Sequence, residues 1–139
     1  MNDSSYLSEI RKDLNKLKAF NVVIYGSYLS KHYIPHRSDI DIAIISQTHD
    51  KEQNFHLLKE TFGKYPDKYD IKVFESMPLF LKIDIINNYE VLFGNPLEIS
   101  EYFYHYRSIW KDMRYRIENN QFNNISEKIE LIQNRKENI

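Results

Sequence analysis

Two short apolar runs rich in β-branched residues constrain the fold of this chain more than any other feature. The first is Asn21 to Tyr25 (NVVIY), and the second is Ser38 to Ser46 (SDIDIAIIS). Both compositions are typical of buried strands, and the second run is apolar enough to lie centrally in a sheet. The first run ends at Gly26-Ser27, a pair that favours a tight turn. The sequence therefore predicts a β-sheet with a glycine turn after its first strand.

Further helices and strands are expected around these two runs. The spacing of apolar residues predicts helices over residues 4–18 and 49–65 and a long helix from about Glu98 to Asn119, and short helices are expected over residues 28–33 and 79–87. In the segment 49–65, this spacing is made by Phe55, Leu58 and Phe62. Two more strands are expected, at Tyr69 to Phe74 and Glu90 to Phe93.

This order of elements predicts an α/β (α+β) fold with a small mixed sheet of about four strands and helices packed on it. The 139 residues fit one compact domain. We expect a catalytic domain over residues 1–120, which includes the long helix. Residues 121–139 then form a polar C-terminal tail that can add a last helix.

Composition and charge exclude several classes of function. The net charge is -1, from 19 basic and 20 acidic residues, so there is no strong nucleic-acid signal. Because cysteine is absent, any bound metal must be held by oxygen or imidazole. The N-terminus is charged throughout, and no segment approaches membrane-spanning length. We therefore expect a soluble, cytoplasmic protein that contacts no membrane.

Three carboxylates are the candidate catalytic and metal-binding residues. Asp39 and Asp41 are separated by one residue, so on a strand both side chains leave the same face. Because two neighbouring acids repel each other, a hard divalent cation such as Mg²⁺ is their natural counterion. Asp70 opens the third strand and can reach the same cluster if the two strands are neighbours. Three acids could then hold two Mg²⁺ ions, an arrangement used for in-line nucleotidyl or phosphoryl displacement.

Gly26 and Ser27 are the candidate nucleotide-binding residues. A glycine turn between a strand and a short helix lets the backbone approach a phosphate, to which amide groups and the Ser27 hydroxyl can donate. The turn lacks a Walker or dinucleotide-binding fingerprint. A P-loop or Rossmann site therefore finds no support, and the phosphate site must be of another type.

These residues resemble a known signature. Gly26-Ser27, eleven intervening residues and Asp39-Ile40-Asp41 are similar to the Gly-Ser and Asp-x-Asp motif of the DNA polymerase beta-like nucleotidyltransferase superfamily. The apolar strands before Gly26 and after Asp41 match in order, as does Asp70 on the next strand. By size, the chain resembles the minimal nucleotidyltransferase (MNT) branch, often the antitoxin half of HEPN/MNT toxin-antitoxin pairs. The stretch 88–94 is similar to the terminal strand region of that branch.

The resemblance implies both an activity and a partner. Gly26 and Ser27 would bind the triphosphate of an NTP, most simply ATP. Asp39 and Asp41 would ligate both metal ions, and Asp70 would complete the site as a ligand and as the base. The acceptor would be a tyrosine of a HEPN ribonuclease, which the transfer of AMP silences.

Several basic residues near this motif have no assigned role. Lys31 and His32 stand where many relatives carry a small residue and an acidic one. His36 and Arg37 could contact phosphates or could face solvent. Lys72 shares a strand face with Asp70 and could neutralise the triphosphate, although a surface lysine is the commoner case.

Three functions remain open at this level. The chain is a protein-modifying antitoxin enzyme, a nucleotidyltransferase acting on a small molecule or an RNA end, or a non-enzymatic antitoxin that neutralises its partner by binding. Three convergent carboxylates would argue against the last, and the absence of a basic tract argues against the second. Acceptor identity, nucleobase preference and homo-oligomer formation are left undetermined.

Overall fold

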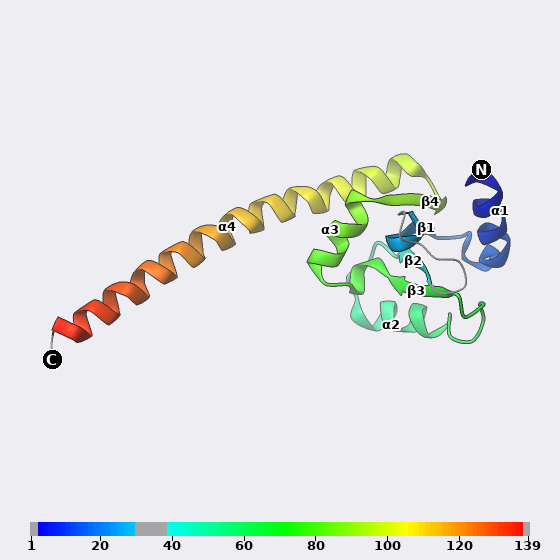
Figure 1. Cartoon of the computed structure of the whole chain (residues 1–139). Helices are drawn as coiled ribbons and strands as arrows, with labels where there is room; N and C mark the ends of the chain where they lie inside the picture. The colour runs from blue at the N-terminus through cyan, green and yellow to red at the C-terminus, as the bar shows by residue number, and fades with distance from the viewer. Residues whose placement is uncertain (1–2, 30–38, 138–139) are drawn as a thin grey trace. The chain divides into compact units, whose positions relative to one another are not determined.

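A computed structural model describes the backbone of residues 3–29 and 39–137, and the side chains of residues 6–29 and 39–116. Within these described residues, three short 3₁₀ helices lie at Asn15–Leu17, Gly26–Leu29 and Phe74–Ser76. The longer elements, shown in Figure 1, are α1 (Asp3–Asp13), β1 (Asn21–Tyr25), β2 (Ile40–Ile45), α2 (Lys51–Lys59), β3 (Tyr69–Val73), α3 (Leu79–Asn87), β4 (Tyr89–Phe93) and α4 (Pro96–Glu137).

The described strands form one four-stranded mixed sheet in the order β3-β2-β1-β4. β1 pairs antiparallel with both β2 and β4, whereas β2 and β3 run parallel. A parallel pair requires a crossover connection, which here contains α2; this helix contacts β3 (Figure 1). The predicted fold class is therefore confirmed.

The two central strands are buried on both faces of the sheet. On one face, Ile24 of β1 and Ile42 of β2 are paired and fully buried, in one hydrophobic cluster with Leu14. On the opposite face, Val23 and Ala43 are also paired and fully buried. Burial on both faces explains why these strands read as nearly continuous apolar runs rather than as alternating ones.

Aromatic rings join the first turns of α4 to the sheet. The Phe103 ring centroid lies 5.0 Å from that of Phe74, which follows β3, and 4.8 Å from that of Tyr89 on β4. The contact with Tyr89 is edge-to-face, a favourable geometry for paired rings. Phe103 is only 2% exposed and therefore has a packing role in the core.

The helix α2 is shorter than the helix expected over residues 49–65. The aromatic residues whose spacing predicted that helix do not form its buried face. Phe55 is 59% exposed and Phe62 lies beyond the helix end, whereas Asn54 is 2% exposed. The Asn54 amide donates to the Thr48 carbonyl at 3.0 Å, and its oxygen accepts from the Ser46 hydroxyl at 2.7 Å. Hydrogen bonding at the end of β2 thus orients α2, because a buried amide must find partners.

This arrangement predicts that substitutions of two adjacent residues have very different effects on stability. Asn54→Ala should lower the free energy of unfolding by about 2 kcal/mol, because the Thr48 carbonyl loses a donor and the Ser46 hydroxyl loses one of its acceptors. Phe55→Ala should change it by no more than about 0.5 kcal/mol, as expected of an exposed side chain. Urea denaturation of both variants checks this. A larger loss for Phe55→Ala would mean that α2 packs through its aromatic face after all.

The chain divides into two compact units, Met1–Phe103 and Tyr104–Ile139. The first contains the sheet, and the second is formed by the remainder of α4 and the C-terminus. α4 starts two residues before the predicted long helix and continues to Glu137 as one helix. The predicted domain boundary at residue 120 stays a prediction. Within the described part of the chain, no helix is both long and apolar enough to cross a membrane.

Candidate active site

Paired residues of all four strands form one polar row at one end of the sheet. Asp41 of β2 lies opposite Asp70 of β3, as the sequence predicts for neighbouring strands. On its other side, Asp41 lies opposite Tyr25 of β1, which in turn lies opposite Tyr89 of β4. Directly paired residues share a face of a sheet, with neighbouring strands about 4.8 Å apart. Two acids and two phenols therefore line the same surface.

Asp39 lies just outside this row. It precedes β2 rather than belonging to it, and its side chain is exposed. Its negative charge nevertheless raises the pKa of Asp41, so the two carboxylates are close enough to interact. Among the side chains that the structure describes, no three acids or histidines are grouped closely enough to form a metal site. The structure thus brings two of the three predicted acids together and leaves Asp39 beside them.

Burial, reinforced by repulsion between carboxylates, sets the electrostatics of the row. Burial raises the pKa of Asp41 most, and the charges of Asp70 and Asp39 raise it further, while Lys72 lowers it. Burial, followed by the charges of Asp41 and Asp70, raises the pKa of the Tyr25 hydroxyl well above its ordinary value. This hydroxyl stays protonated at neutral pH and can act as a hydrogen-bond donor beside the acids.

The donor set fits a divalent metal ion. Asp41 and Asp70 offer oxygen ligands on adjacent strands, and their mutual repulsion is relieved by positive charge. Mg²⁺ prefers carboxylate oxygens and keeps several ligand positions for water or phosphate, so it does not need an enclosed protein cage. An open site supplied by a few acids is therefore consistent with magnesium.

The glycine turn is held directly against Asp41. Gly26 begins the 3₁₀ helix Gly26–Leu29 and has a φ of +78°, a conformation that residues with a side chain rarely adopt. A Cβ atom on Gly26 would meet the Asp41 carboxylate oxygen Oδ2 at 2.4 Å. The half-buried Ser27 follows in the same turn. The candidate phosphate-binding turn and the carboxylates therefore form one site.

A matched pair of glycine variants tests this contact. Gly26→Ala should lower kcat/KM for the reaction at this site about 50-fold, because the new Cβ displaces the Asp41 carboxylate. Gly63→Ala is the control: Gly63 has a similar φ of +71°, but nothing lies within 4 Å of its Cβ position. Both variants should lose about 1 kcal/mol of stability from backbone strain. Equal activity of the two would show that the contact with Asp41 is unimportant.

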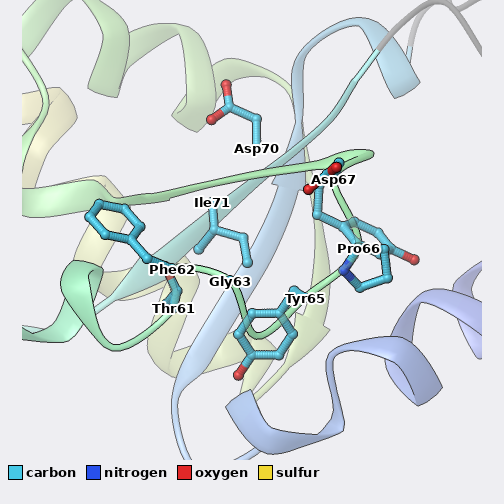
Figure 2. A pocket seen from close by; sticks show the side chains of 9 residues that line it. Thr61, Phe62, Gly63, Tyr65, Pro66, Asp67, Asp70 and Ile71 are labelled. Atoms are coloured by element: carbon cyan, nitrogen blue, oxygen red, sulfur yellow. The ribbon is translucent and has the colours of Figure 1, made fainter.

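A cavity of about 220 Å³ lies beside β3, and of the polar row only Asp70 contributes to its lining. In Figure 2, Ile71 and Tyr65 lie on one side of the strand and the Asp70 carboxylate lies on the other. The cavity is lined by Thr61, Phe62, Gly63, Tyr65, Pro66, Asp67, Tyr69, Asp70 and Ile71. Because the Asp70 carboxylate points away from it, this cavity is not the place where the acids act.

Tyr25 and Tyr89 are members of the polar row that were not predicted from the sequence. Tyr25 immediately precedes the Gly26-Ser27 motif, and this position is the signal that could have identified it. Tyr89 offered no such signal, because its place depends on the pairing of β1 with β4, which contains an irregularity between Val22 and Val23. The loop residues of undecided role lie outside the described part of the chain: Lys31, His32, His36 and Arg37.

Comparison with known proteins agrees with this geometry. A family model described as a nucleotidyltransferase domain matches residues 6–92, which include the glycine turn and all three acids. A relative from Methanocaldococcus jannaschii, provisionally named a protein adenylyltransferase, is 47% identical over 114 residues. That alignment covers 82% of this chain and 88% of the relative.

Solved structures of toxin-antitoxin complexes show the same fold. A chain from the complex of tri-AMPylated Shewanella oneidensis HEPN toxin with MNT antitoxin has a TM-score of 0.56 and 19% identity. That match covers 81% of this chain and 90% of the other. A chain from a toxin-antitoxin structure with AMP-PNP has a TM-score of 0.55 and 19% identity, covering 84% and 92%. With the family match extending over more than half of its residues, this chain belongs to the nucleotidyltransferase domain family.

Proposed function

We propose that this nucleotidyltransferase uses Mg²⁺ to move AMP from ATP to a tyrosine hydroxyl of a HEPN-type toxin, and so acts as an antitoxin. The observation that carries the proposal is the in-register pair Asp41 and Asp70 beside the Gly26 turn. Nucleotidyl transfer needs carboxylates next to a phosphate-binding backbone, and this site supplies both groups.

The choice of acceptor rests on the relatives. The Methanocaldococcus jannaschii protein is provisionally named for transfer to a protein, and at 47% identity a shared acceptor class is expected. The structural neighbours come from complexes of an MNT antitoxin with a HEPN toxin, one of which is tri-AMPylated. An acceptor on another protein also suits this chain, because the described cavity beside β3 faces away from the Asp70 carboxylate.

The proposed reaction is an in-line displacement at the α-phosphorus of ATP. Asp70 accepts the proton of the acceptor phenol, whose oxygen forms a bond to the α-phosphorus as the bond to the β-phosphate oxygen breaks. Pyrophosphate leaves while Ser27 and the backbone of Gly26 hold its oxygens. The Tyr25 hydroxyl, protonated beside the acids, can donate to Asp41 or to the substrate. Positioning and charge supply most of the catalysis.

Mg²⁺ would be held by Asp39, Asp41 and Asp70, and when bound it would neutralise the phosphates and favour the ionised nucleophile. The raised pKa of Asp41 suits this role, because a bound cation lowers the pKa of a carboxyl group and so favours the ionised form that binds the metal. This set of ligands, the use of two ions and a cytoplasmic location stay predictions.

Mass spectrometry of the acceptor tests the proposal. A HEPN-type toxin incubated with this chain, ATP and Mg²⁺ should gain whole AMP units, located by peptide mapping on a tyrosine. Replacement of that tyrosine with phenylalanine should abolish the gain and keep the two proteins bound. AMP found only on a serine, or on RNA in the preparation, would overturn the assignment of the acceptor.

A further inference from the structure

Lys72 is the charged residue beside the row that the proposed reaction leaves without a role. It lies on β3 two residues after Asp70, so both side chains leave the same face of the sheet. Its Nζ atom is 3.5 Å from Oδ2 of Asp70, and the two side chains are 48% and 40% exposed. Its charge also acts on Asp41. One ammonium group therefore interacts with both paired carboxylates.

An ordinary surface ion pair of this length would contribute little to stability. What distinguishes this pair is the carboxylate involved, because Asp70 lies in register with Asp41 at the proposed metal site. A cation bound to Asp70 reduces the negative charge that a metal ion would otherwise meet. The same ammonium adds positive charge where a triphosphate must bind, and the two effects have opposite signs.

We propose that Lys72 is a substrate-binding residue that pairs with Asp70 in the free enzyme and shifts to a phosphate of the bound nucleotide. Lysine suits such an exchange, because its compact charge sits on a flexible stem and is half exposed here. In the free enzyme, Lys72 reduces the repulsion between the carboxylates and discourages binding of a divalent ion without nucleotide. The proposal rests on the nucleotide site of the proposed function but not on its acceptor.

Calorimetric titration of the full chain tests this without any acceptor protein. Mn²⁺ alone, and separately a non-hydrolysable α,β-methylene ATP with Mg²⁺, are titrated into the wild type and Lys72→Met. The variant should bind Mn²⁺ about threefold to tenfold more tightly, because a competing charge is gone. It should bind the nucleotide about tenfold more weakly, because a charged contact to phosphate is lost. Lys72→Arg should stay close to the wild type for both ligands.

Lys68 provides a matched control. Its Nζ atom lies 3.6 Å from Asp13 Oδ2 and its side chain is 49% exposed, but Asp13 is not part of the polar row. Lys68→Met should alter neither affinity. If Lys72→Met also alters neither, or shifts both in the same direction while Lys72→Arg binds normally, the proposal is overturned. Failure of transfer to tyrosine would instead count against the proposed acceptor, since neither titration involves one.

Discussion

Asp41→Asn is expected to lower kcat for nucleotide transfer about 1,000-fold, the loss typical of removing a group that stabilises charge in the transition state. The substitution keeps the size of the side chain and its fit against Gly26 but removes the charge. An amide is a poor ligand for a hard divalent cation compared with a carboxylate. Steady-state assays at saturating ATP check the result.

The same variant should not lose stability at neutral pH. Burial and neighbouring charges raise the pKa of Asp41 in the folded protein. A carboxyl with a raised pKa stabilises the fold at acidic pH, where it is protonated, and this contribution is lost as pH rises through the raised pKa. Asp41→Asn should therefore match or exceed the Tm of the wild type, with a larger advantage at about pH 8 than at about pH 5.

Asp84→Asn, at an exposed position of α3, is the control and should keep full activity. An Asp41→Asn protein that retains activity would contradict the assignment of Asp41 to the reaction. A variant that unfolds would contradict the electrostatic account of the row.

Glu75→Ala is expected to lower the free energy of unfolding by about 4 kcal/mol, the largest stability effect anticipated for this chain. Glu75 is 8% exposed and accepts hydrogen bonds from four donors. They are the Ser46 amide at 3.0 Å, the Ser46 hydroxyl at 3.0 Å, the Gln47 amide at 2.9 Å and the Tyr102 hydroxyl at 2.7 Å. Without the carboxylate, these donors lose their shared acceptor and a cavity is left.

The network lies at the end of β2 that is opposite to the polar row. Glu75→Ala should therefore lower the free energy of unfolding strongly but change the kcat of the folded protein little. Guanidinium denaturation measures the loss, and Glu101→Ala, at an exposed position of α4, provides a control. Tyr102→Phe, which removes a single donor, should cost about 1 kcal/mol. A loss below about 1 kcal/mol for Glu75→Ala would mean that water replaces the carboxylate at little cost.

The local sequence pattern was sufficient to predict those elements whose limits are set by residues close to them in the chain. β1 and α3 have the predicted limits, since a glycine turn ends the first and Pro78 precedes the second. Ile40 and Ile42 are both buried, because a strand places alternate residues on one face. The order of motifs was also enough to anticipate that Asp70 joins the acids, and the register with Asp41 confirms the strand pairing.

Long-range pairing accounts for what the sequence did not predict. The spacing of Phe55 and Phe62 indicated the wrong helix face, because hydrogen bonds from Asn54 to the end of β2 orient α2 instead. Tyr89 joins the polar row only through its register with Tyr25. The burial of Glu75 could not be recognised from the neighbouring sequence, because its four donors belong to residues at least 27 positions away. Such contacts follow from the fold and not from local periodicity.

The most direct test of the central claim is to follow ATP labelled either on the α-phosphate or on the γ-phosphate, with Mg²⁺ and a HEPN-type partner. Nucleotidyl transfer predicts that only the α-label reaches the partner, and that Asp41→Asn prevents it. Transfer of the γ-label would identify a kinase reaction instead. No transfer of either label within a stable complex would contradict the enzymatic account and indicate neutralisation by binding.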